Sequence, residues 1–217
     1  MSAVTKKFNR SILLFTGLLL AQTGHAAVMI DDFLAYQRVE NASTLPAPVT
    51  TGTQLSNLTR ILTASQSADS GASTKVIVDD YYGQLSIANN ASSKGSASIF
   101  YSFNSIDLTA VADALVFDLD FVDLIGHQIQ VIANTNSVYG FAAMNVAGLH
   151  SILFSEFTDP LVFQHLTSLQ INFRGERNWD ALYGSISANT KVPEPSIFAL
   201  LSIGLMLMSR VSRKAYA

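Results

Sequence analysis

The sequence predicts an all-β protein, an antiparallel β-sandwich of the jelly-roll type, with an apolar helix near each end of the chain. Short segments of alternating apolar and polar residues recur along the middle of the chain, and turn-forming residues separate them. No long amphipathic helix interrupts this series. Nine or more short strands within about 165 residues are typical of a sandwich.

The clearest strand is at 114–121, where leucine and phenylalanine occupy every second position and two aspartates lie between them. Residues 128–133 and 169–174 alternate in the same way, with glutamine and asparagine among their polar positions. Segment 41–74 is rich in Ser, Thr and Ala, so we expect one or two strands around 58–62 among long loops. Further strand candidates are 28–33, 75–79, 84–88, 98–103, 150–154 and 183–188.

The N-terminal end has three parts in a fixed order. Lys6, Lys7 and Arg10 come first, an apolar centre of roughly 10 residues follows, and small residues surround Ala26 and Ala27. This order is typical of a secretory signal peptide that signal peptidase removes after Ala26 or Ala27. We therefore expect residues 1–27 to be cleaved and the protein to be exported. A buried N-terminal helix is the alternative.

The C-terminal end carries a second apolar segment. Residues 197–208 contain no charge and precede Arg210, Arg213 and Lys214. Twelve helical residues span about 18 Å against roughly 30 Å of hydrocarbon, so the segment predicts a short, marginal transmembrane helix. The basic residues resist translocation, which keeps this end in the cytoplasm and the central domain outside. A short interfacial or core helix is the alternative.

Pro193, Glu194 and Pro195 stand just before this apolar segment. Together, residues 192–217 resemble a PEP-CTERM sorting signal. The resemblance implies a Gram-negative bacterium that makes extracellular polysaccharide, and an exosortase, a membrane-embedded cysteine transpeptidase that recognises Pro-Glu-Pro. It also implies a transient anchor in the inner membrane, followed by release or transfer to the cell surface. The two prolines keep the motif extended, so a processing enzyme can reach it.

Residues 28–191 form one predicted secreted domain. It contains seven basic and 15 acidic residues, a net charge of −8, which argues against a nucleic-acid or anionic-membrane partner. The chain has no cysteine, so the fold depends on its core, and a bound ion would add to its stability.

The order of several short motifs resembles galactose-binding-like jelly rolls, the fold of many carbohydrate-binding modules. These motifs are Ile-Asp-Asp-Phe at 30–33, the segments 106–109, 152–157 and 166–171, and the pair Trp179 and Asp180. The resemblance implies a structural calcium where the first and last strands lie side by side, with Asp31 or Asp32 and Asp180 as its ligands. The alternative is that Asp32 caps a turn and Asp180 begins one.

Sugar recognition combines aromatic faces that stack on pyranose rings with polar groups that fix hydroxyls. Tyr81 and Tyr82 lie next to turn residues, and Arg174 and Arg177 precede the sole tryptophan, Trp179. We expect the loop at 174–180 to form a binding edge. The alternative is that Trp179 covers the core.

Catalytic motifs are not apparent. His127, His150 and His165 have no metal-ligand spacing, and the chain has no cysteine nucleophile. We expect each histidine in a loop or on the surface of a strand. The sequence therefore predicts a non-catalytic surface or matrix protein, exported, sorted by an exosortase and able to bind exopolysaccharide through its sandwich. The alternative is a small secreted polysaccharide-active enzyme with unrecognised catalytic residues.

Overall fold

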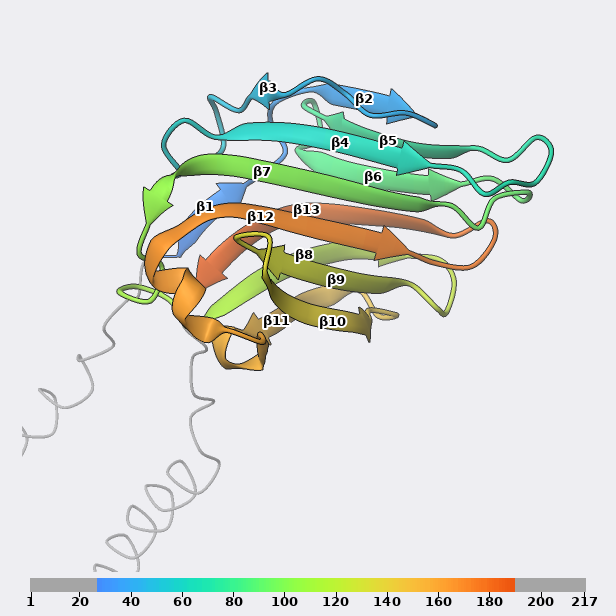
Figure 1. The fold of residues 1–217 in the computed structure, drawn as a ribbon. Coiled ribbons are helices and arrows are strands. Elements are labelled where there is room, and N and C mark those ends of the chain that lie inside the picture. The colour runs from blue at the N-terminus through green and yellow to red at the C-terminus, as the bar shows by residue number, and fades with distance from the viewer. Residues whose placement is uncertain (1–26, 190–217) are drawn as a thin grey trace, which may run out of the picture.

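A computed structural model describes residues 27–189, which form two antiparallel β-sheets packed face to face (Figure 1). The prediction of an all-β antiparallel sandwich is confirmed. The signal peptide, the Pro-Glu-Pro motif and both apolar helices expected from the sequence lie outside the described residues. Within residues 27–189, no helix has the length and apolar character needed to span a membrane.

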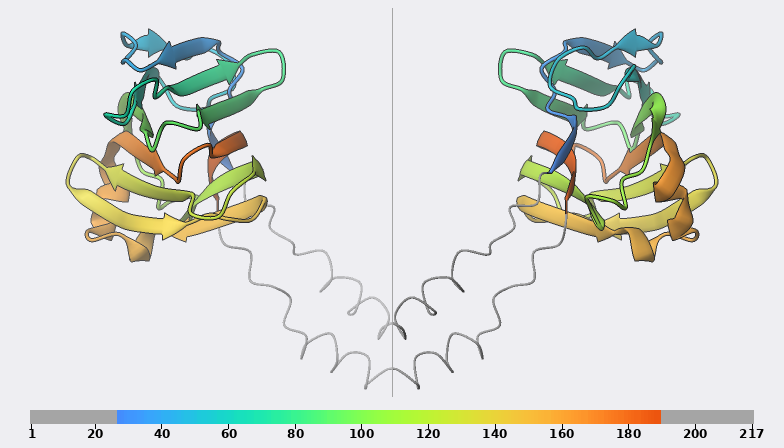
Figure 2. Two further views of the ribbon diagram at one scale, coloured as in Figure 1. Left: turned by 90° about the vertical axis from the view of Figure 1, so that its right-hand side faces the viewer. Right: turned by 90° about the vertical axis from the view of Figure 1, so that its left-hand side faces the viewer.

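One layer is a seven-stranded sheet in the order β11, β8, β13, β6, β5 and β2, with β1 also pairing with β13. The two layers can be followed from both sides in Figure 2. The strands of this sheet are β1 (Val28–Asp31), β2 (Gln37–Glu40), β5 (Thr74–Asp79), β6 (Gln84–Asn89), β8 (Ala114–Val122), β11 (Gly148–Leu153) and β13 (Asp180–Asn189).

The other layer is a six-stranded sheet in the order β10, β9, β12, β7, β4 and β3. Its strands are β3 (Ala47–Pro48), β4 (Thr59–Ser65), β7 (Ser96–Ile106), β9 (Gln128–Ala133), β10 (Ser137–Ala143) and β12 (Leu166–Arg174). Two short 3₁₀ helices, η1 (Phe154–Glu156) and η2 (Pro160–His165), connect β11 of the first sheet to β12 of the second.

The period of two expected from the sequence is clear on β8. Leu115, Phe117 and Leu119 are fully buried on β8, and the residues between them point outward. The sequence missed β2, β3 and β10. It also extended the first strand too far, because Asp31 ends β1 by accepting a hydrogen bond from the Phe33 amide at 2.9 Å.

The turn between β9 and β10 explains how an edge strand is added there. Asn134 and Thr135 both have left-handed backbone conformations, with φ of 48° and 67°. Asparagine tolerates this region, and the Asn134 Oδ1 atom also accepts the backbone amides of Thr167 at 2.8 Å and Ser168 at 3.2 Å. The turn is thereby fixed to β12, and β10 lies beside β9.

A buried ion pair joins the two sheets. The Asp31 carboxylate on β1 lies 2.6 Å from the Arg60 guanidinium on β4, and both side chains are at most 1% exposed. The Tyr101 hydroxyl donates to the same carboxylate at 2.8 Å, and Arg60 donates to the Gln37 side chain at 2.9 Å and to the Ala35 carbonyl. Burial, and then the Asp31 charge, raise the pKa of Tyr101 well above its usual value. The pair is fully hydrogen-bonded, as a buried charge must be.

Candidate functional site

The outer surface of the six-stranded sheet is almost free of charge. Alternate residues of β4, β7, β12 and β9 point away from the core, and they are hydroxyl, amide and apolar side chains with a single arginine. We call this surface the amide face, and its residues are Thr59, Ile61, Thr63, Ser65, Ser96, Ser98, Phe100, Ser102, Gln128, Gln130, Ile132, Gln170, Asn172 and Arg174.

Side-chain amides are linked in the middle of this face. The Gln170 amide donates to the Asn172 Oδ1 atom at 2.8 Å, and the Asn172 amide donates to the Gln130 Oε1 atom at 2.8 Å. These bonds connect β12 to β9 and fix the side chains in place. Each amide has two donors and an acceptor, so groups remain that can bond a ligand.

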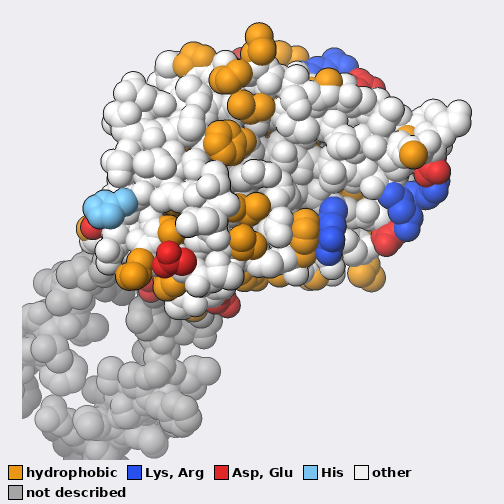
Figure 3. All heavy atoms as spheres, in the orientation of Figure 1, with side chains coloured by type: hydrophobic (Ala, Val, Ile, Leu, Met, Phe, Trp, Pro, Cys, Tyr) orange, Lys and Arg blue, Asp and Glu red, His pale blue; other side chains and the backbone are white. Residues whose placement is uncertain are grey.

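A row of outward residues crosses the strands, with apolar side chains on either side of Gln170, and we call it the apolar strip. The strand register aligns Ile61 with Phe100, and aligns Gln170 with both Phe100 and Ile132. Val138 on β10 continues the row next to Ile132. From β4 to β10 the strip spans four inter-strand spacings, about 19 Å. In Figure 3 hydrophobic side chains gather in a band across this sheet, among polar ones.

Arg174 ends the amide face beside β10. Its guanidinium carbon lies 3.6 Å above the centre of the Phe141 ring, and its Nε atom donates to Gln128 at 2.7 Å. The sequence predicted Arg174 as a binding residue, and the structure places it at the edge of a polar surface. The cation–π contact and the hydrogen bond hold its guanidinium in place.

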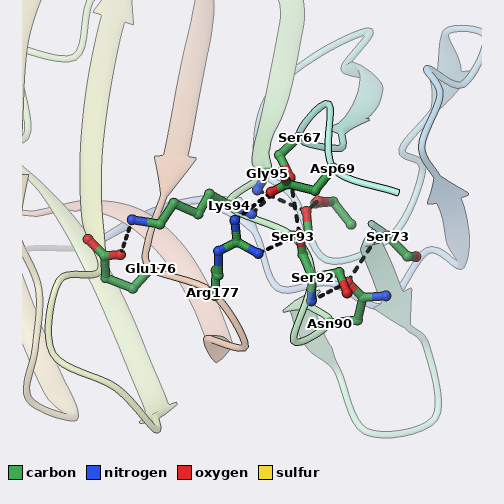
Figure 4. A network of polar contacts seen from close by, with 11 residues as sticks. Ser67, Asp69, Ser73, Asn90, Ser92, Ser93, Lys94, Gly95, Glu176 and Arg177 are labelled. Atoms are coloured by element: carbon green, nitrogen blue, oxygen red, sulfur yellow. Dashed lines mark hydrogen bonds and ion pairs between the residues drawn. The ribbon is translucent and has the colours of Figure 1, made fainter. Parts of the chain in front are cut away.

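Arg177 has a different environment. It pairs with Asp69 at 2.6 Å and donates to the Ser92 carbonyl at 3.3 Å, while Lys94 pairs with Glu176 at 2.6 Å (Figure 4). These contacts join the loops at 66–73, 90–95 and 175–179 at one end of the sandwich. Arg174 and Arg177 therefore do not converge on one site, and Arg177 connects loops.

Trp179 is fully buried, so it covers the core, which was the alternative interpretation of the sequence, and offers no exposed ring. Its indole lies against Gly175, where any side chain would collide with it, and stacks on the His127 ring at 4.6 Å.

His127 lies in the loop just before β9, one of the two positions expected for it, but not at the surface. This histidine is fully buried, stacks on Trp179 and is hydrogen-bonded to the Tyr183 hydroxyl. Burial lowers the pKa of His127 from 6.5 to about 4, because the aromatic surroundings disfavour the charged ring. This burial is not visible in the sequence, because Gly126 and His127 stand in a turn-like context.

The predicted calcium ligands lie apart. Asp31 is opposite Ile186 near one end of β13 and is occupied by Arg60, whereas Asp180 begins β13 opposite Ala88. Six residues of strand separate the two positions, about 20 Å. Among residues 27–189, no three His, Cys, Asp or Glu side chains come close enough to hold a metal. The expected bridge from Asp31 to Asp180 is therefore wrong in its geometry.

The remaining aspartates have local roles. Asp32 accepts the Leu34 amide at 3.2 Å, as the turn-capping alternative predicted. The Asp180 amide donates to the Asp123 carboxylate at 2.7 Å. Desolvation, and then the Asp123 charge, raise the pKa of Asp180.

Tyr81 and Tyr82 lie in the turn between β5 and β6 and are 84% and 69% exposed. They stand at the start of β6, while Trp179 lies near Asn89 at its far end, where the Asn89 amide donates to the Trp179 carbonyl at 3.0 Å. The predicted ligand residues are thus divided between two ends of one strand. No single binding edge unites them.

No carboxylate lines the pocket that the described residues form at 48–59. A pocket of about 430 Å³ lies among residues 48–59, and no side chain lining it is acidic, basic or histidine. Asp118 and Asp120 project from β8 on the outer surface of the other sheet. A glycosidase needs two carboxyl groups across one cleft.

No family model matches the chain, and no characterised protein resembles it closely enough to count as a relative. Among solved structures, it is similar to the family 11 carbohydrate-binding module of the Clostridium thermocellum cellulase Lic26A-Cel5E, with a TM-score of 0.40 and 12% identity over 78% of this chain and 99% of the module. It is also similar to the family 11 module from Clostridium thermocellum in complex with a β-1,3-1,4-mixed-linked tetrasaccharide. That comparison has a TM-score of 0.40 and 11% identity over 77% of this chain and 98% of the module.

Sequence reasoning missed the amide face. One feature of the sequence does indicate this face. The polar positions of 128–133 and 169–174 are mostly amides, where charged residues are usual. The missing information was the register, because nothing in the sequence shows that Gln130 lies beside Asn172 or that Phe100 lies beside Ile61.

Proposed function

We propose that this protein is exported and non-catalytic, acts at the cell surface or in the extracellular matrix, and binds a neutral polysaccharide through its amide face. The observation that carries the proposal is the placement of linked amides beside an apolar strip on a surface with no acidic residue. The domain around that surface has a net charge of −8, so the absence of acids there is distinctive.

The amide face suits a polyhydroxylated ligand for three reasons. Fixed amides and hydroxyls can donate to and accept from sugar hydroxyls without desolvating a charge. Phe100, Ile61 and Ile132 offer surface for the C–H faces of pyranose rings. The strip of about 19 Å is long enough for several consecutive sugars. A polymer lying across the strands would meet all of these groups.

An enzyme acting on polysaccharide is the second candidate. It would need a pair of acids near the bound chain, and the outward positions of β4, β7, β9 and β12 contain none. Incubation with a bound polysaccharide should leave its chain length unchanged. Shortened products that disappear when Asp118 and Asp120 are replaced would favour the enzyme.

Binding is tested by affinity electrophoresis in gels that contain mixed-linkage β-1,3-1,4-glucan, galactomannan, dextran or alginate. We expect retardation by at least one neutral polymer and none by anionic alginate. Replacing Gln130 and Asn172 together by alanine should weaken the binding about tenfold, because two hydrogen-bonding groups are lost. The matched control is Gln164→Ala, an exposed amide on η2 outside the face. Equal retardation of the double variant and the control, or no retardation by any neutral polymer, would contradict the proposal.

Sorting by an exosortase is the part of the proposal that rests on residues 192–217 alone. Replacing Glu194 and both flanking prolines should leave an unprocessed precursor in the inner membrane, whereas Ser196→Ala should be processed normally. Release of the triple variant with the same mature C-terminus, measured by mass spectrometry, would refute this sorting.

A further inference from the structure

A second exposed apolar cluster lies on the other sheet, at the turn between β5 and β6. Tyr81 and Tyr82 project there with 84% and 69% of their surface exposed, and their rings meet edge to face with centroids 4.8 Å apart. Two neighbouring tyrosines so open to solvent contribute nothing to the core. They are the kind of rigid, amphipathic side chain that binding surfaces use.

The turn that carries these rings is fixed. The Asp79 carboxylate accepts the backbone amides of Tyr81 at 3.0 Å and Tyr82 at 3.4 Å, and Gly83 follows with φ of 61°. A glycine is needed at this last position because other residues rarely adopt that conformation. The tyrosines therefore stand on a preformed support, which lowers the entropy cost of binding.

A second segment extends the cluster. Gly83 lies against Leu34 and the Asp32 carbonyl. A Cβ atom added at Gly83 would lie 3.3 Å from that carbonyl oxygen and 3.4 Å from the Leu34 side chain. Tyr36 is next to Gln37, which pairs with Val78 on β5, so it lies beside Asp79. Leu34 and Tyr36 are 47% and 61% exposed. We call Leu34, Tyr36, Tyr81 and Tyr82 the tyrosine cluster.

The charges around the tyrosine cluster are negative, which disfavours an anionic partner. Asp32, Asp79 and Asp80 are interleaved with it, and the segments 32–36 and 79–83 contain no lysine or arginine. Carboxylates repel anionic lipid surfaces and acidic polymers but accept hydrogen bonds from hydroxyl groups. Aromatic faces and carboxylates together fit a neutral sugar.

We propose that the tyrosine cluster is a second glycan-binding site, separate from the amide face. The cluster belongs to strands of the seven-stranded sheet and the amide face to the six-stranded sheet. One domain therefore contacts two polysaccharide chains and links them. This inference takes its ligand class from the proposed function, but its residues and its test are independent of the amide face.

The test uses purified protein with isotope-labelled tyrosine, titrated with the neutral polysaccharides of the panel above and observed by NMR. We expect the ring signals of Tyr81 and Tyr82, assigned with the Tyr81→Phe and Tyr82→Phe variants, to shift. Replacing both tyrosines by alanine should abolish turbidity caused by cross-linked polymer and weaken overall binding several-fold. Leu161→Ala, which removes a 66% exposed apolar side chain on η2, is the matched control and should change neither.

Each result has one meaning. Shifts confined to the amide face, with unchanged turbidity in the double alanine variant, overturn the second site and leave the proposed function intact. Tyrosine shifts that persist when Gln130 and Asn172 are replaced support the second site even if the amide face does not bind. Tyrosine shifts with neutral lipid vesicles in place of glycans, or with neither probe, overturn the second site.

Discussion

The two outer surfaces of the sandwich have the same backbone pattern but opposite chemistry. On the seven-stranded sheet, outward positions carry many charges, namely those of Arg38, Glu40, Lys75, Asp79, Asp118 and Asp120. Some of these charges have local partners. Arg38 forms an ion pair with Glu40 at 3.4 Å, and the Asp120 carboxylate accepts a hydrogen bond from the Gln84 amide at 2.9 Å. On the amide face the equivalent positions carry one charge, that of Arg174.

This difference in chemistry is what the proposed binding of a neutral polymer to the amide face would require. Charged outward positions favour solubility and repel like-charged copies. A charge on a binding face would have to lose part of its hydration when a neutral polymer covers it. Amides and hydroxyls exchange water for sugar hydroxyls at much smaller cost. Alternation therefore specifies which residues face outward, and their kind specifies what those residues do.

The largest expected effect concerns the connection between the sheets, since both surfaces depend on it. Arg60→Ala leaves Asp31 buried and unpaired, and should lower the free energy of unfolding by about 3–5 kcal/mol in urea titrations. Arg38→Ala, which breaks an exposed pair, should cost less than about 1 kcal/mol. Equal losses in the two variants would show that the buried pair does not hold the sheets together.

The next effect concerns His127, which lies under the amide face at the start of β9. The pKa of His127 is about 4 in the folded protein and 6.5 in the unfolded chain. Between these two pH values the unfolded chain therefore binds more protons than the folded protein. Stability is therefore unaffected by this group above pH 6.5 and falls as the pH drops, by about 3 kcal/mol at pH 4. His127→Gln should remove this part of the pH dependence, and His165→Gln, at an exposed position, should keep it. Parallel pH profiles for wild type and His127→Gln would contradict the assignment.

A smaller effect sharpens the contrast between the faces through two phenylalanines. Phe100→Ala removes the aromatic side chain of the apolar strip and should weaken neutral-glycan binding by about 1–2 kcal/mol. Phe121→Ala removes a 45% exposed ring from β8 of the other sheet and should leave affinity unchanged. Isothermal titration of both variants makes the comparison. Equal losses would mean that the strip has no special role.

The smallest effect is expected on the charged surface. Asp118→Asn changes one outward residue of β8, far from any described pocket, and should alter stability by no more than about 0.5 kcal/mol. Its affinity for neutral polysaccharide should match that of the wild type. A clear gain in affinity would show that this surface also approaches the glycan.

The sequence predicted the sandwich because period-two alternation is a local property, visible at Leu115, Phe117 and Leu119. The prediction from the sequence failed where the environment of a side chain depends on residues that are distant in the sequence. Asp31 was predicted as a calcium ligand, but Arg60 on β4 forms an ion pair with it. His127 is buried because Trp179 and Tyr183 pack against its ring. The Tyr81 and Tyr82 side chains were recognised from turn residues beside them. The amide face was not, because it exists only through the register of β7, β12 and β9.

The most direct test of the central claim, glycan binding on the amide face, observes its amides themselves. The side-chain NH₂ signals of Gln128, Gln130, Gln170 and Asn172 are followed by NMR while fragments of the most tightly bound neutral polysaccharide are added. We expect these signals to shift together, with Gln164 on η2 and Asn189 on β13 unchanged. Stationary signals on the amide face at saturating glycan would contradict this claim.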